Sequence, residues 1–167
     1  MRTLLIGGAL GILMVSLVAC GGSSTSSATQ QASQRKADFW DIDQIEKNFH
    51  KATTKKDIRL MMSLWAPNAT FTLGPGQTAT GKKQIRQFWL DKSKLFQPAN
   101  YWISDHPAYK VRVTVNGDRG TLHFECHYVN AKTGKVIAAT AADMDVARIN
   151  GRWLITNMVG GSTTLSL

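Results

Sequence analysis

Residues 109–159 alternate between apolar and polar side chains, and this pattern restricts the second half of the 167-residue chain to β-structure. Apolar side chains occupy every second position in 109–115 and again in 122–128. A period of two places alternate side chains on opposite faces of a strand. Turn-forming residues separate the strands at 116–118 (Asn-Gly-Asp), 133–134 (Thr-Gly) and 150–151 (Asn-Gly). We therefore predict long antiparallel hairpins.

Helical patterns precede these strands. Apolar residues recur every three or four positions from Phe39 to Ala52, which indicates an amphipathic helix. Asp57 suits the N-terminus of a second, short helix that runs through Trp65 and ends before Pro67. The spacing of apolar residues predicts a third helix over 82–96.

A brief strand over 69–73 and a Gly-Pro-Gly turn link the second and third helices. Helices followed by antiparallel hairpins are typical of an α+β domain in which a curved sheet wraps around the helices. We predict one such domain over residues 37–167.

The first twenty residues read as a separate unit. Arg2 precedes an uncharged apolar or small stretch, 4–19, which is shorter than the roughly 20 residues that a spanning helix needs. A positive start, a short apolar core and small residues before a cut are typical of a secretory signal. The sequence 17–20 (Leu-Val-Ala-Cys) resembles the bacterial lipobox, which implies cleavage ahead of Cys20 and a lipid on its thiol. The alternative is an ordinary secretory signal that happens to precede a cysteine.

We therefore predict a lipoprotein signal peptide over 1–19 and an exported protein. The lipid on Cys20 would anchor it to the outer face of the cell membrane or to the outer membrane. Residues 21–36 contain Gly, Ser, Thr and Gln but no large apolar side chain, a composition typical of flexible linkers. Together with Cys20 they are predicted to form a tether over 20–36.

The chain carries a formal net charge of +9, but its basic residues are scattered. The charge therefore does not predict nucleic-acid binding; attraction to anionic lipid or cell-wall polymer, or simple solubility, explains it as well. With Cys20 lipidated, Cys126 is the one cysteine left and no intrachain disulfide is expected. Cys126 shares its strand face with Leu122, Phe124 and Tyr128, so we predict that it is buried.

Three motifs resemble one known family. Residues 56–70 (KDIRLMMSLWAPNAT), 81–89 (GKKQIRQFW) and 149–155 (INGRWLI) are similar in order and spacing to motifs of SnoaL-like and ketosteroid-isomerase-like domains. These domains belong to the nuclear-transport-factor-2-like superfamily. The resemblance covers about residues 37–163. It implies a cone-shaped fold with a mixed sheet, three helices, an apolar pocket and a homodimer formed through the sheet.

The resemblance does not carry over the isomerase's chemistry. Leu73 stands where that family has its catalytic base, and Phe49 where it has an oxyanion-hole tyrosine. Asp145 matches the position of the family's buried acid, and Asp143 shares its strand face. Either could act as an acid or base in an apolar pocket. The alternative is a structural carboxylate that pairs with Arg148 or Arg112.

His123, Glu125 and His127 lie on one face of a predicted strand, a set of side chains that metal sites use. Ligands along one straight strand lie roughly 6–7 Å apart and converge poorly. Because the opposite face holds the apolar residues, these three are expected to face solvent or a dimer partner. We predict no metal and no cofactor.

Aromatic residues are abundant, and most are expected in the core. The sharper hypothesis is that some of them line a pocket for a small apolar ligand. The candidates for this lining are Phe49, Trp65, Phe71, Leu73, Phe88, Tyr101 and Trp102. His50 and His106 fall at polar positions and carry no clear signal.

Three functions remain open from the sequence. The first is a non-catalytic, lipid-anchored module that binds or senses a small molecule. The second is a lyase, isomerase or cyclase that uses Asp145. The third is a cell-envelope protein that contacts a partner through its sheet.

Overall fold

The computed structural model describes residues 23–74, 76–104, 108 and 110–164. The elements follow one another as α1 (Ser23–Lys55), α2 (Ile58–Ser63), β1 (Trp65–Thr72), β2 (Thr78–Thr80), α3 (Gly81–Asp91), the 3-10 helix η1 (Lys94–Phe96), β3 (Trp102–Ser104), β4 (Lys110–Asn116), β5 (Arg119–Asn130), β6 (Val136–Ile149) and β7 (Arg152–Thr164). The predicted signal peptide and Cys20 lie outside the described residues.

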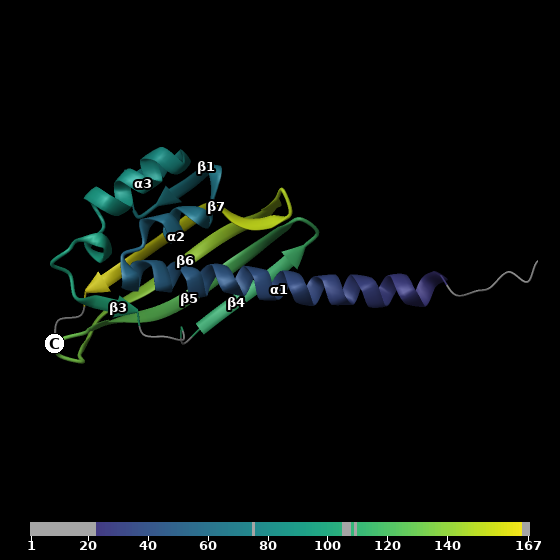
Figure 1. Ribbon diagram of the computed structural model, residues 1–167, viewed down its shortest axis with the longest axis horizontal. Helices are drawn as coiled ribbons and strands as arrows, with labels where there is room; N and C mark the ends of the chain where they lie inside the picture. The colour runs from purple at the N-terminus through teal and green to yellow at the C-terminus, as the bar shows by residue number, and fades with distance from the viewer. Residues whose placement is uncertain (1–22, 75, 105–107, 109, 165–167) are drawn as a thin grey trace, which may run out of the picture.

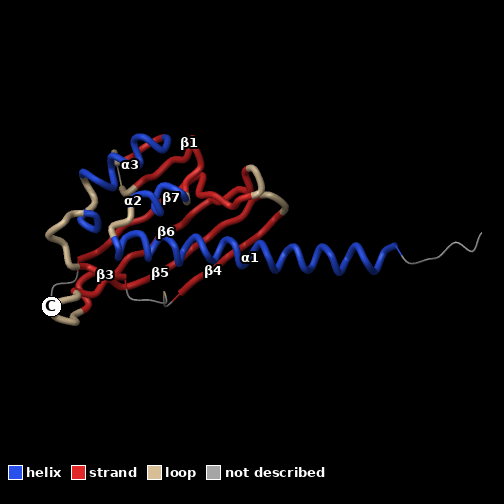
Figure 2. Tube along the Cα trace, viewed as in Figure 1, coloured by secondary structure: helices blue, strands red, loops and turns tan. Residues whose placement is uncertain are grey.

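The strands form one mixed sheet in the order β2-β1-β7-β6-β5-β3, and β4 pairs with the first part of β5 (Figure 2). Strand β1 runs parallel to β7, whereas the other described pairs are antiparallel. The long hairpins β4–β5, β5–β6 and β6–β7 confirm the prediction from the alternating pattern. The helices cover one face of the curved sheet, which confirms the α+β fold class (Figure 1).

The core lies between this sheet face and the helices. Leu122, Phe124, Cys126 and Tyr128 of β5 are all buried, as their shared face predicted. Helix α1 contributes Ile42, Ile45, Phe49 and Ala52 to the same core. Apolar side chains at these spacings are buried on the same face of their element, and this burial is the main favourable contribution to folding.

Helix α1 begins at Ser23, and this corrects the predicted flexible tether. Residues 23–36 continue the helix beyond the end of the sheet, where the purple ribbon of Figure 1 projects alone. Residues 27–36 are exposed. No Gly or Pro occurs from Ser23 to Lys55, and Ala, Gln, Arg and Lys favour helix. The packed half of α1 supplies the nucleus from which this polar half can propagate.

Within the described part of the chain, no helix combines the length and the hydrophobicity needed to cross a membrane.

Two element boundaries differ from the predictions. Strand β1 begins at Trp65, so Pro67 lies inside a strand and not after a helix. The pairing of β1 with β7 shifts register between Trp65 and Thr70, and such an irregularity accommodates proline, which has no N–H to donate. Asp57 is confirmed as the N-cap of α2, where its Oδ1 accepts a hydrogen bond from Leu60 N at 2.9 Å.

The predicted third helix is interrupted. Helix α3 ends at Asp91, Ser93 is extended, and η1 follows over Lys94–Phe96. The interruption buries Leu95 and Phe96 against the core. It also brings residues 92–95 to the wall of a cavity.

Candidate functional site

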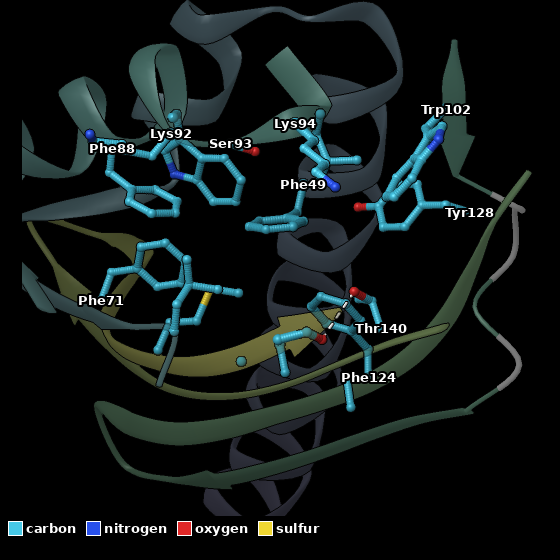
Figure 3. A pocket seen from close by; sticks show the side chains of 18 residues that line it. Phe49, Phe71, Phe88, Lys92, Ser93, Lys94, Trp102, Phe124, Tyr128 and Thr140 are labelled. Carbon is cyan, nitrogen blue, oxygen red and sulfur yellow. Dashed lines mark hydrogen bonds between the residues drawn. The ribbon is translucent and has the colours of Figure 1, made fainter. Parts of the chain in front are cut away.

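A cavity of about 250 Å³ lies between the helices and the concave face of the sheet (Figure 3). Its lining comes from α1, β1, α3, the segment from Lys92 to Leu95, β3, β5, β6 and β7. The lining residues are Phe49, Phe71, Leu73, Phe88, Trp89, Lys92, Ser93, Lys94, Leu95, Trp102, Phe124, Tyr128, Thr140, Ala141, Ala142, Met158, Gly160 and Gly161. An engineered cavity of about 150 Å³ holds benzene, so this one admits a molecule somewhat larger than a single ring.

Aromatic rings that pack on one another form much of the wall. Phe71 stacks on Trp89 at a centroid distance of 5.3 Å, and Phe88 meets Phe71 edge-on at 5.0 Å. Phe49 contacts both Trp89, at 5.5 Å, and Phe124, at 5.6 Å. Each such pair adds about 0.5–1.5 kcal/mol beyond the burial of its area, which holds the rings in place without a ligand.

A few polar groups interrupt this wall. The hydroxyl of Thr140 donates to the carbonyl oxygen of Gly161 at 3.1 Å, and both residues line the cavity. Ser93 is buried, whereas Lys92 and Lys94 remain exposed at the mouth. Tyr128 is only 1% exposed, and burial raises the pKa of its phenol, so this hydroxyl stays protonated.

The structure brings together five of the seven pocket candidates from the sequence. Phe49, Phe71, Leu73, Phe88 and Trp102 line the cavity. Trp65 is fully buried behind Phe71, with ring centroids 5.5 Å apart, and belongs to the core. Tyr101 is 46% exposed, and the Lys132 ammonium lies 3.5 Å from its ring centroid, away from the cavity.

Asp143 and Asp145 lie outside the cavity, which corrects their expected place in a pocket. Strand β6 turns Ala142, Met144 and Val146 toward the core, so by alternation the two aspartates occupy the other face. Both aspartates are exposed. The Asn157 side-chain amide donates to Asp145 Oδ2 at 3.1 Å. Neither carboxyl therefore lies in the apolar cavity.

The histidine cluster lies on the same outer face of the sheet. His123 Nδ1 is 2.7 Å from Asp143 Oδ1, and its Nε2 is 3.1 Å from Glu125 Oε1. The Lys110 ammonium lies 2.5 Å from the same Glu125 oxygen. Each ring nitrogen of His123 is thus in contact with a carboxylate oxygen. Across the described ranges, no three His, Cys, Asp or Glu side chains are arranged to hold a metal ion.

The family profile of the SnoaL-like domain matches residues 47–154, which is more than half of the chain. The chain belongs to the SnoaL-like family. This confirms the resemblance that the sequence motifs indicated. No curated protein sequence matches this SnoaL-like chain.

Solved structures show the same fold at low sequence identity. A nuclear-transport-factor-2-like protein with a cystatin-like fold, from Novosphingobium aromaticivorans, superposes with a TM-score of 0.67 at 14% identity, over 85% of this chain and 90% of that one. A protein of unknown function from Nostoc punctiforme gives 0.65 at 19% identity, over 76% and 92%. A hexachlorocyclohexane dehydrochlorinase from Novosphingobium barchaimii gives 0.64 at 16% identity, over 79% and 92%.

Two buried polar clusters in this SnoaL-like domain were not found from the sequence. In the first, Glu46 and His50 of α1 are almost completely buried, and Glu46 Oε1 lies 2.5 Å from His50 Nδ1. The His50 ring contacts Phe124 edge-on at 4.7 Å and Phe49 at 6.0 Å. Since those two rings line the cavity and the pair does not, Glu46 and His50 lie behind its wall.

The second cluster surrounds Asp38, which is 3% exposed. Its Oδ1 accepts hydrogen bonds from Gln34, Arg148 and Trp153, at 3.0, 2.5 and 3.2 Å respectively. Arg148 also donates from Nε to Asp118 at 2.9 Å and lies over the ring of Trp153. Arg148, a predicted partner of Asp145, is thus paired with two other aspartates. This cluster fastens α1 to the β6–β7 hairpin.

Spacing along α1 could have revealed both clusters. Asp38, Glu46 and His50 fall at the three- and four-residue intervals that join Ile42 and Phe49 to the core. Polar residues on an apolar face are buried as well when they supply one another with partners.

Proposed function

We propose that this protein is a non-catalytic, lipid-anchored module that binds a small, largely apolar molecule outside the cytoplasm. The observation that carries the proposal is the composition of the cavity. Its described lining is rich in aromatic side chains and contains no Asp, Glu, His or Cys. Binding sites for small molecules are typically apolar concavities with a few polar groups.

The geometry weakens the alternative of an acid–base enzyme. Leu73 and Phe49, which stand at the isomerase's catalytic positions, both line the cavity and have no titratable side chain. Asp145, the remaining candidate acid, is exposed on the opposite face. Similar solved structures include a dehydrochlorinase and a putative dehydratase, but these activities are named for those proteins and not for this chain. A general acid or base must reach the proton that it transfers.

Filling the cavity should weaken binding. Ala142 is buried in the cavity wall, so the larger side chain of Ala142→Leu would occupy ligand space. We expect 1-octanol, titrated by calorimetry, to bind the wild-type chain and to bind this variant at least about tenfold more weakly, a loss of about 1.4 kcal/mol.

Ala139→Leu is the matched control because Ala139 lies at an alternate position of the same strand and is not among the residues that line the cavity. Octanol affinity should be unchanged in this variant. Equal affinities of all three proteins would place binding elsewhere and contradict the proposal. If Ala142→Leu weakens octanol binding as expected, native mass spectrometry of the chain extracted from its host would identify the molecule that the cavity retains.

The lipid anchor is supported by the short apolar leader and by the residues 17–20 that resemble a lipobox. Cys20→Ser should abolish processing that globomycin inhibits, and with it incorporation of labelled fatty acid. In cell fractionation, a lipid on residue 20 should then no longer hold the variant in the membrane fraction. Cys126→Ser is the control, because that thiol is buried in the core and should not affect labelling. Undiminished labelling of the Cys20 variant would refute the anchor.

A further inference from the structure

The polar atoms that the cavity wall leaves without partners are hydrogen-bond donors. Among the described residues, the Tyr128 hydroxyl and the Trp89 indole N–H are buried and have no hydrogen-bond partner. The Thr53 hydroxyl is close enough to interact with the Tyr128 hydroxyl, but the two do not meet hydrogen-bond geometry, and Thr53 donates to the carbonyl oxygen of His50 at 2.9 Å. Leaving a buried donor unsatisfied is unfavourable, so each donor favours a ligand that supplies an acceptor.

A cation stands at the same end of the cavity as the Tyr128 hydroxyl. The Lys94 ammonium lies 6.0 Å from the ring centroid of Trp102, and that ring lies 6.2 Å from the ring of Tyr128. In Figure 3 the Lys94 nitrogen and the Tyr128 oxygen both point toward the space between Phe49 and Trp102. Lys94 makes no ion pair with any residue that the structure describes.

We infer that the ligand is an apolar monocarboxylic acid whose carboxylate binds Tyr128 and Lys94 and whose hydrocarbon part fills the aromatic cavity. This inference rests on the proposed function, since it specifies the chemical class of molecule that the same cavity takes. The Tyr128 hydroxyl donates one hydrogen bond to the carboxylate, and the Lys94 ammonium supplies the opposite charge. Bonds of this charge-assisted kind are roughly twice as strong as those between neutral groups.

The arrangement selects against other headgroups. An ammonium ligand would meet Lys92 and Lys94 at the mouth, where the lining offers it no carboxylate. A neutral alcohol would accept the hydrogen bond from Tyr128 but would provide no negative charge to pair with the Lys94 ammonium. Because Lys94 is exposed, the carboxylate would stay partly hydrated, which limits the cost of its desolvation. The burial that raises the pKa of Tyr128 keeps its proton available for donation.

The test compares three ligands that share an eight-carbon chain: octanoate, 1-octanol and octylamine. Calorimetric titrations would use the chain without residues 1–20, since this piece keeps every described residue and the whole core. At neutral pH, where octanoate is ionised, it should bind at least about tenfold more tightly than 1-octanol, and octylamine most weakly.

Two substitutions locate the headgroup. Tyr128→Phe removes only the hydroxyl, and Lys94→Met removes the charge while keeping most of the apolar stem. Each should weaken octanoate binding about tenfold. Lys94→Met should change 1-octanol binding by less than about threefold, whereas Tyr128→Phe, which also removes the hydroxyl that an alcohol can contact, should weaken 1-octanol less than it weakens octanoate. Lys132→Met is the control, because it removes the same charge from an exposed lysine that lies over Tyr101 and outside the cavity. Circular dichroism would verify that each variant keeps the wild-type fold.

The outcomes separate this inference from the proposed function. If octanoate and 1-octanol bind equally and Ala142→Leu weakens both, the cavity binds apolar molecules but the carboxylate inference is wrong. Equal loss of both ligands in Tyr128→Phe and Lys94→Met would also overturn it. If none of the three ligands binds, the inference and the proposed function fail together.

Discussion

Replacing Asp38 by asparagine should lower the free energy of unfolding by about 2–3 kcal/mol, because the Asp38 carboxylate accepts charge-assisted hydrogen bonds in a nearly buried position. The variant keeps the size of the side chain but removes the charge that Arg148 contacts. Urea denaturation at neutral pH, followed by circular dichroism, measures the difference.

The effect of Asp38→Asn should depend on pH. Burial alone would raise the pKa of Asp38, but the hydrogen bonds from Gln34, Arg148 and Trp153 hold it below its ordinary value. A lowered folded-state pKa means that the stabilisation is present above the unfolded-state pKa of about 3.9. It is lost as the pH falls through the lower folded-state pKa. The difference between wild type and variant should therefore shrink under acid conditions.

Asp118→Asn is the matched control. Asp118 contacts the same guanidinium as Asp38, but its side chain is 77% exposed, so its replacement should change the stability little. If the two substitutions have equal effects, or if that of Asp38→Asn does not vary with pH, Asp38 does not stabilise the contact between α1 and the hairpin in the way described.

Glu46→Leu should lower the free energy of unfolding by about 3 kcal/mol, since it removes the carboxylate beside His50 Nδ1 within the core. Replacing both residues, in Glu46→Leu with His50→Leu, should recover much of the loss. Apolar side chains of similar volume often substitute for a buried polar pair without net cost. Denaturation of the two single variants and the double variant forms a thermodynamic cycle that isolates the coupling.

Asp43→Leu supplies the comparison on the same helix. Asp43 and Lys47 form a pair with the same four-residue spacing, but both side chains are partly exposed. An exposed helix pair contributes about 0.3–0.5 kcal/mol. Similar losses from Glu46→Leu and Asp43→Leu would show that burial does not strengthen the Glu46–His50 contact.

The hairpins could be predicted from the sequence because one face of an antiparallel sheet is buried. When one face packs on a core, the period of two decides which residues point inward. Phe124 and Tyr128 therefore line the cavity and the core, while His123 and Glu125 lie on the outer face.

Element boundaries were less predictable because distant parts of the chain determine them. The backbone N–H of Ile155 donates to the carbonyl oxygen of Leu64 at 2.8 Å, next to the point where β1 begins. Pairing with β7 thus takes Trp65 into a strand, although its local sequence continues the apolar pattern of a helix. Similarly, burial of Leu95 and Phe96 accompanies the extended conformation of Ser93, which no local pattern indicates.

The position of Asp145 was mispredicted because its assignment rested on a match to the family's buried acid, and the alanines on both faces of β6 do not show which face packs on the core. Ala138 and Ala142 face inward, whereas Ala139 and Ala141 occupy the alternate positions, so small side chains alone do not identify the core face. The pairing of β6 with β7 also shifts register between Asp145 and Val146. Only the complete sheet determines which face the carboxyl occupies.

If the proposed lipid on Cys20 is present, the straight projection of α1 affects how the domain is held at a membrane. Residues 23–36 form about 21 Å of helix beyond the domain, and the helix starts three positions after Cys20. With a lipid on Cys20, this segment would act as a spacer of fixed length. A helical spacer would restrict the distances from the lipid headgroups that the domain can sample, whereas a random-coil linker would let it sample every distance down to contact.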